Sequence, residues 1–147
     1  MIADQKRLLK TLTTLIKVED TAIRDLKNKM SLLSNQIDEL ETELATMKER
    51  IHQEKTFMKS DLIFHDDLAR YLRHADDRKQ KILSQKIKLE EEWQKYYDQL
   101  IEHAKSQKSY ESVHLQTKKD IQEMQDLKDR NALDDLILMR RGTDQGG

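Results

Sequence analysis

The feature that most constrains the fold is a run of apolar residues spaced alternately by three and four positions through the first third of the chain. The run spans about six heptads, and Glu19 is its one interruption. Its members are Leu9, Leu12, Ile16, Ile23, Leu26, Met30, Leu33, Ile37, Leu40, Leu44, Met47 and Ile51. A sustained period of about 3.5 residues is typical of a left-handed coiled coil, whereas a surface helix of a globular domain follows about 3.6. We therefore predict one long helix over about residues 2–55 that carries a single apolar face.

The composition favours long, thin helices over a thick globular core. Hydrophobic residues make up 36% of the chain and charged residues 37%, proline is absent, and all 3 glycines lie at or after Gly142. Helices that bury several faces need more apolar residues than this, and nothing before Gly142 would break a helix. The chain is therefore expected to be all-α.

A second, poorer seam begins at Leu68, after a stretch in which the heptad period breaks. Polar residues interrupt it, with Lys79 and Lys86 at two contact positions and a polar series from His103 to Thr117. Its apolar members are Leu68, Leu72, Ala75, Ile82, Leu89, Trp93, Tyr96, Leu100, Ile121, Met124 and Leu127. Polar residues at contact positions lower the stability of a coiled coil, so the middle of this helix is expected to be weakly held.

The boundaries of the second helix follow from capping signals. Ser60 or Asp61 can act as the N-cap, and Arg140 and Arg141 followed by Gly142 are typical of a helix C-terminus. We predict a bend over about residues 56–61, a second helix over about 62–141 and a disordered tail over 142–147.

Folding back at this bend pairs the two helices antiparallel. Counting places Ile51 opposite Leu72 and Leu9 opposite His114. The second helix then extends past the start of the first, so residues 115–141 have few apolar partners within the chain. The expected fold is one antiparallel coiled-coil hairpin over 1–147 with a C-terminal helical overhang, which is a surface for a partner or for self-association.

Charge and residue types exclude several functional classes. The net charge of −1 provides no general attraction for nucleic acid, and the chain has 0 Cys. The 5 histidines form no i,i+4 pair, and no glycine-rich loop could hold a phosphate, so we expect no catalytic residue, cofactor or metal. No apolar stretch approaches the roughly 18 residues that a membrane span requires, and no signal peptide is evident, so we expect a cytoplasmic protein without membrane insertion.

Two aromatic residues flank the predicted bend. Phe57 and Phe64 have little core to enter at the tip of a thin hairpin. They either close the end of the two-helix seam or form an exposed binding tip, and the sequence leaves both alternatives open.

Two short segments carry a resemblance to a known family. The second helix begins with SDLIFHDDLARYLRHADDRKQKI, and the chain closes with DLKDRNALDDLILMRR. With the long N-terminal coiled-coil helix, these segments resemble the FliJ/YscO family of bacterial type III secretion and flagellar export, with its injectisome YscO branch favoured. The matching residues of the closing segment are Lys128, Asp129, Leu133, Asp134, Leu136, Arg140 and Arg141.

The resemblance implies a non-enzymatic central stalk that links a hexameric secretion ATPase to the membrane export gate. Secretion chaperones are further implied partners, and the isolated hairpin is expected to be a monomer associated peripherally with the inner-membrane export apparatus. The implied ATPase contacts are Leu133, Asp134, Leu136, Ile137, Arg140 and Arg141.

The same resemblance implies a gate contact at the start of the second helix. Its residues are Leu68, Leu72, Ala75 and Lys79, where the flagellar branch has an aromatic residue at the first position and His at the last. The heptad pattern offers an alternative, in which these residues pack against Met47 and Ile51 of the first helix.

Two other functional classes fit a long coiled coil. One is a scaffold that dimerises in parallel as a straight rod, and the other is a prefoldin-like holding chaperone. The chaperone needs a β-rich segment between its helices, and residues 52–67 are too short and too charged to supply one.

Overall fold

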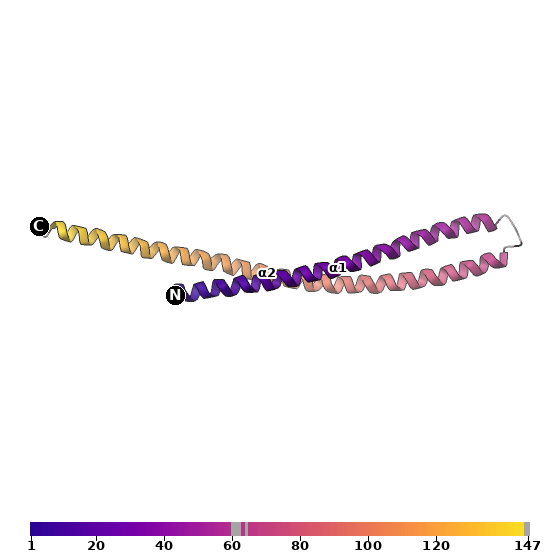
Figure 1. The fold of residues 1–147 in the computed structure, drawn as a ribbon, viewed down its shortest axis with the longest axis horizontal. Coiled ribbons are helices and arrows are strands. Elements are labelled where there is room, and N and C mark those ends of the chain that lie inside the picture. The colour runs from indigo at the N-terminus through magenta and orange to yellow at the C-terminus, as the bar shows by residue number, and fades with distance from the viewer. Residues whose placement is uncertain (60–62, 64, 146–147) are drawn as a thin grey trace. The chain divides into compact units, whose positions relative to one another are not determined.

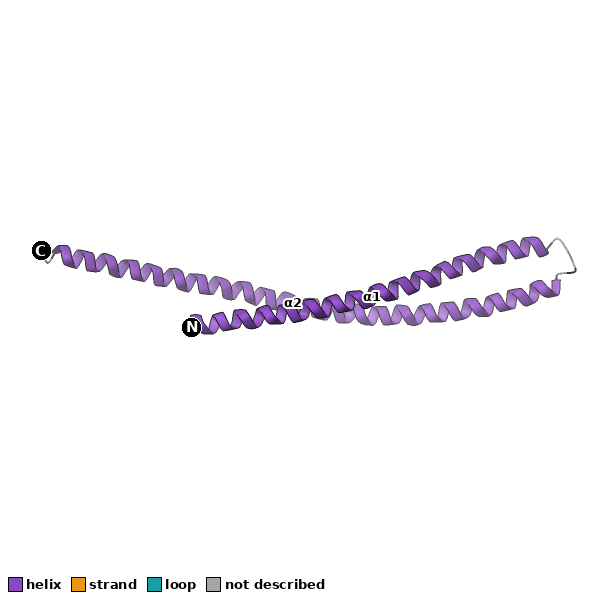
Figure 2. Cartoon of the chain, viewed as in Figure 1, coloured by secondary structure: helices purple, strands orange, loops and turns teal. Residues whose placement is uncertain are grey.

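The protein consists of two long helices in a computed structural model that describes the backbone of residues 1–59, 63 and 65–145 and the side chains of this set up to residue 142. Helix α1 (Ile2–Met58) and helix α2 (His65–Gln145) account for nearly all of it (Figures 1 and 2), and these ranges contain no strand. The two helices pack against each other, which confirms the predicted all-α helical hairpin.

In the central unit, Arg24–Ile101, the two helices run antiparallel. The carboxylate of Glu43 on α1 lies 2.7 Å from the guanidinium of Arg78 on α2. Farther from the bend, the ammonium of Lys29 lies 5.4 Å from the centre of the Tyr96 ring. Contacts of later α2 residues are thus made with earlier α1 residues, as an antiparallel pair requires.

The core of the central unit is one residue thick. Its buried side chains are Leu26, Leu33, Leu40 and Ile82, and Ile82 is 0% exposed. A single apolar stripe on each helix produces this core, because the other faces carry charged residues that stay in water.

The terminal unit, Met1–Ile23 with Glu102–Gly147, repeats the antiparallel arrangement. Its buried residues are Leu12 on α1 and Thr117 and Ile121 on α2. Within this unit α2 extends beyond the beginning of α1 (Figure 1).

The predicted seam is confirmed along almost its whole length. Every predicted contact position of α1 from Leu9 to Ile51 is buried or half-buried, and so is every one on α2 from Leu68 to Ile121 except Lys79. Lys79 is exposed, because a lysine at a contact position turns its ammonium into water. Met124 and Leu127 are also exposed, since they lie past the start of α1.

The predicted register agrees with the contacts. Ile51 and Leu72 line one groove of the central unit, as counting indicated. In the terminal unit His114 reaches Thr13, which lies about one turn from its predicted neighbour Leu9.

The helix ends near the bend differ from the predicted ones by a few residues. Helix α1 continues to Met58, and the N–H of Lys59 still donates to the carbonyl of Lys55 at 3.0 Å. Helix α2 begins at His65, with Asp66 and Asp67 in its first turn, where the helix dipole favours negative charge. The two predicted N-caps, Ser60 and Asp61, lie outside the described residues.

The predicted helix stop at Gly142 does not hold, because α2 runs to Gln145. A disordered tail over 142–147 is therefore wrong for residues 142–145, while 146–147 lie outside the described residues. A glycine inside a helix costs only about 1 kcal/mol relative to alanine, so it does not have to end one. No described glycine has the positive φ of a left-handed C-cap.

Neither helix, over the residues described, contains a segment long and apolar enough to cross a membrane.

The burial of Ile82 gives a test of the two-helix core. Ile82→Ala should lower the free energy of unfolding by about 2–5 kcal/mol, because it removes buried methylenes and leaves a cavity. Ile87→Ala is the matched control, since Ile87 is 55% exposed and its loss should cost less than about 0.5 kcal/mol. Urea denaturation followed by circular dichroism measures both, and equal costs would contradict this core.

Candidate functional site

The most exposed apolar surface lies on the C-terminal part of α2. Every side chain from residue 122 to 142 is exposed. Among the apolar ones, Leu136 is 63% and Ile137 44% exposed. A helix with this many exposed leucines and isoleucines is typical of a binding surface.

Four of the six predicted ATPase contacts meet on one face of this segment. Leu133, Leu136, Ile137 and Arg140 border a single shallow depression, together with Met139. Their spacing of three, four and seven residues places them on one side of a helix. The other two, Asp134 and Arg141, are exposed and each lies about 100° further around the helix axis.

This apolar face is not a continuation of the hairpin seam. Ile121 and Met124 take heptad positions a and d of α2, which face α1 where it is present. In that frame Leu133, Leu136 and Ile137 occupy positions f, b and c, which point away from the seam. We call the residues at these three positions from 123 to 140 the outer stripe; they are Glu123, Asp126, Asp129, Arg130, Leu133, Leu136, Ile137 and Arg140.

The predicted gate residues lie in the central unit, beside α1. Leu68, Leu72 and Ala75 are half-buried. Leu72, Ala75 and Lys79 line a groove whose α1 wall includes Leu44, Met47 and Ile51. The heptad alternative placed these α2 residues against Met47 and Ile51, and the shared groove agrees with it.

The groove exists because the seam is underfilled at this level. Ala75 has a short side chain, and Lys79 is exposed although it stands at a contact position. Lys48 and Lys55 of α1 also line the groove, with Asp76 as its acidic residue. The result is an apolar floor with a mainly basic rim.

The two predicted tip residues have different outcomes. Phe57 is 68% exposed, which agrees with a binding tip better than with closure of the seam. Phe64 lies outside the described residues.

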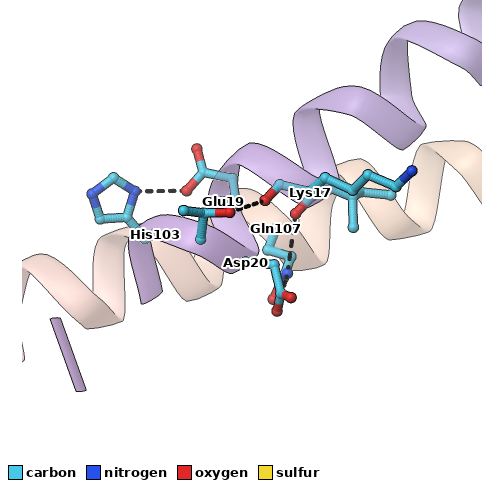
Figure 3. Close-up of polar contacts among 7 residues, drawn as sticks. Lys17, Glu19, Asp20, His103 and Gln107 are labelled. Carbon is cyan, nitrogen blue, oxygen red and sulfur yellow. Dashed lines mark hydrogen bonds and ion pairs between the residues drawn. The ribbon is translucent and has the colours of Figure 1, made fainter. Parts of the chain in front are cut away.

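A polar cluster that the sequence reasoning did not assign lies in the seam of the terminal unit (Figure 3). The Nδ1 atom of His103 is 2.6 Å from a carboxylate oxygen of Glu19. The side chain of Glu19 is only 15% exposed, and that of His103 is 41% exposed. The one interruption of the α1 seam is therefore matched by a polar residue on α2.

Polar side chains in the next turns of the seam also have hydrogen-bond partners. The side-chain amide of Gln107 donates to the carbonyl of Ile16 at 3.3 Å and approaches Asp20 at 3.5 Å. The Nε2 atom of His114 lies 3.3 Å from the hydroxyl of Thr13. These pairs hold the register, because a slide of one heptad would leave Glu19 in the seam without its hydrogen bond.

The sequence contained a signal for this cluster. Glu19, His103, Gln107 and His114 are all visible as polar residues at contact positions, and antiparallel counting brings Glu19 close to His103. The pairing follows only when the two helices are counted together.

A lysine at a contact position of the central unit is likewise paired with side chains of opposite charge. The ammonium of Lys86, a half-buried seam residue, lies 3.0 Å from Glu41 and 3.8 Å from Glu90. The hydrogen bond to Glu41, followed by attraction from both carboxylates, raises the pKa of Lys86 above its ordinary value, although partial burial opposes the shift.

Metal-ligand clusters are absent from the described part of the chain, where no three His, Cys, Asp or Glu side chains gather around a common point. The exposed apolar features of the described residues include the outer stripe, the groove of the central unit and Phe57.

No protein-family model matches this chain, and no curated protein or solved structure does either.

The polar cluster gives a second test. Replacing Glu19 and His103 together by Leu should raise the free energy of unfolding by about 1 kcal/mol, because apolar packing replaces a partly buried polar pair. Glu19→Leu alone should stabilise less, since His103 then loses its acceptor.

The control for this test is an exposed pair on α2. Glu102→Ala with Lys105→Ala removes an ion pair whose side chains are both more than two-thirds exposed, and stability should change by less than about 0.5 kcal/mol. Thermal unfolding measures all variants, and a double leucine variant less stable than the parent would contradict this reading of the cluster.

Proposed function

We propose that this chain is a non-enzymatic central stalk of a bacterial type III secretion export apparatus. It links the secretion ATPase ring to the membrane export gate, with secretion chaperones as further partners, and it associates peripherally with the inner-membrane apparatus. The main support for the proposal is the exposed apolar face of the outer stripe. The two segments that resemble the family add to it.

The ATPase contact is assigned to the C-terminal part of the stripe. Leu133, Leu136 and Ile137 can each contribute about 1.5–3 kcal/mol when a partner buries them. Arg140 and Arg141 lie about one turn after Ile137. Their positive charges favour a partner with an acidic surface around the apolar contact. Asp134 contributes the one negative charge among the six residues.

The gate contact is assigned to the groove of the central unit. Leu72, Ala75 and Lys79 form part of its lining, and Leu68 lies one turn before Leu72. An apolar floor with lysines at its rim is suited to an amphipathic partner segment with acidic flanks.

The mechanism is mechanical. Chemistry belongs to the ATPase, and the stalk transmits displacement. In the terminal unit, the Glu19–His103 and Gln107–Ile16 hydrogen bonds resist sliding of α1 along α2. A force on the outer stripe therefore passes along the single helix beyond Ile121 to the part of α2 that is paired with α1 in this unit.

The two alternatives receive less support. A parallel scaffold needs a free seam along α1, and that seam is already used by α2 in both units. A prefoldin-like chaperone needs a β-rich segment, and none occurs in the ranges 1–59 and 65–145.

The test is an affinity pull-down from the native host's lysate, with the full chain immobilised and bound proteins identified by mass spectrometry. We expect recovery of a secretion ATPase, and at least about a tenfold loss with Leu133→Ser and Leu136→Ser together, because burial of two leucines is removed.

The control for the pull-down is Leu32→Ser with Leu115→Ser. These leucines are 64% and 57% exposed, close to the 63% and 58% of Leu136 and Leu133. Equal loss of the ATPase with both double variants, or no secretion ATPase with the parent chain, would overturn the proposal.

A further inference from the structure

The outer stripe has an ordered charge pattern. Its N-terminal part carries Glu123, Asp126 and Asp129, and the basic Arg130 follows them. Its C-terminal part is apolar, with Leu133, Leu136 and Ile137, and it ends in the basic Arg140. All these side chains are exposed, and Asp126 also accepts a hydrogen bond from the Gln122 amide at 3.0 Å on its own helix. A face that is acidic at one end and basic at the other is complementary to itself when reversed.

The complementarity can be followed residue by residue. If Leu133 lies opposite Leu133 of a second, antiparallel copy, Asp126 lies opposite Arg140 of that copy. The flanking positions fit as well, because Arg141 comes within one turn of Glu123, and Arg130 within one turn of Asp134. Each ion pair then occurs twice, as two-fold symmetry requires.

The parallel orientation is disfavoured by the same residues. It would place Asp126 against Asp126 and Arg140 against Arg140, and like charges across a helix pair are destabilising. Nor does the hairpin itself cover the stripe, because positions b, c and f point away from the seam that α1 occupies.

We propose that residues 123–141 bind the same segment of a second copy of this chain, in antiparallel orientation, through the outer stripe. The contact is about 27 Å long and buries three apolar side chains from each copy, which is small for a protein interface. The pair is therefore weak and forms as concentration rises.

This inference goes beyond the proposed function and does not depend on it. It revises the sequence-based expectation of a monomer, which considered only the hairpin seam. Under the proposed function, the ATPase and the second copy compete for Leu133, Leu136 and Ile137.

The first experiment is charge reversal, read by sedimentation equilibrium of the purified full chain over a concentration series. One variant carries Glu123→Arg and Asp126→Arg, and the other carries Arg140→Glu and Arg141→Glu. Each alone should dimerise at least about tenfold more weakly than the parent, because the ion pairs become repulsive. An equimolar mixture should recover association, because every reversed charge then meets an opposite charge.

Lys81→Glu with Lys88→Glu reverses two exposed charges of the central unit and should leave dimerisation unchanged. Circular dichroism confirms that each variant keeps its helix content. A parent chain that stays monomeric at every concentration, or a mixture that fails to associate, would overturn the proposal.

Orientation is tested by spin labelling, which is direct because the chain contains 0 Cys. A single cysteine is placed at Asn131 or Gln125, which both lie off the stripe. In the antiparallel pair the two Asn131 sites are about 6 Å apart along the axis and the two Gln125 sites about 24 Å. Electron–electron resonance should thus give a clearly longer distance for Gln125, and equal distances would mean a parallel pair and overturn the proposal.

Discussion

Each helix of this protein carries an apolar seam, and the packing of the two seams against each other determines the rest of the structure. The core is one residue thick in each unit: Leu26, Leu33, Leu40 and Ile82 are buried in the central unit, and Leu12 and Ile121 in the terminal unit. Because mainly charged residues occupy the other faces of the paired helices, neither unit builds a second layer from its described residues. A binding function therefore has to use the outside of a helix or a gap in the seam.

Polar residues in the seam add specificity to this simple packing. Glu19 and His103 are polar partners at contact positions on opposite helices, and Lys86, at a contact position of α2, pairs with the exposed Glu41 beside the seam of α1. A seam of leucines alone would tolerate several registers, whereas these pairs favour one. The stability that they cost is small because both pairs remain partly accessible to water.

The sequence predicted the helices, their antiparallel pairing and the register, because a heptad repeat constrains all three at once. It did not predict where α2 ends, since one glycine lowers helix stability without stopping the helix. For the contact residues that it predicted at the C-terminus of α2, it did not indicate the face of the helix. That face became evident only when Ile121 proved buried and fixed the heptad frame in which Leu133 and Leu136 point away from α1.

The central claim is that α1 supports α2 as far as Ile121 and that the exposed segment 122–142 beyond it lacks this support. Amide hydrogen exchange of the dilute protein tests this directly, because an unsupported helix opens with a low free energy. The account predicts strong protection over residues 103–121 and fast exchange over residues 122–142. Equal protection of the two segments would contradict it.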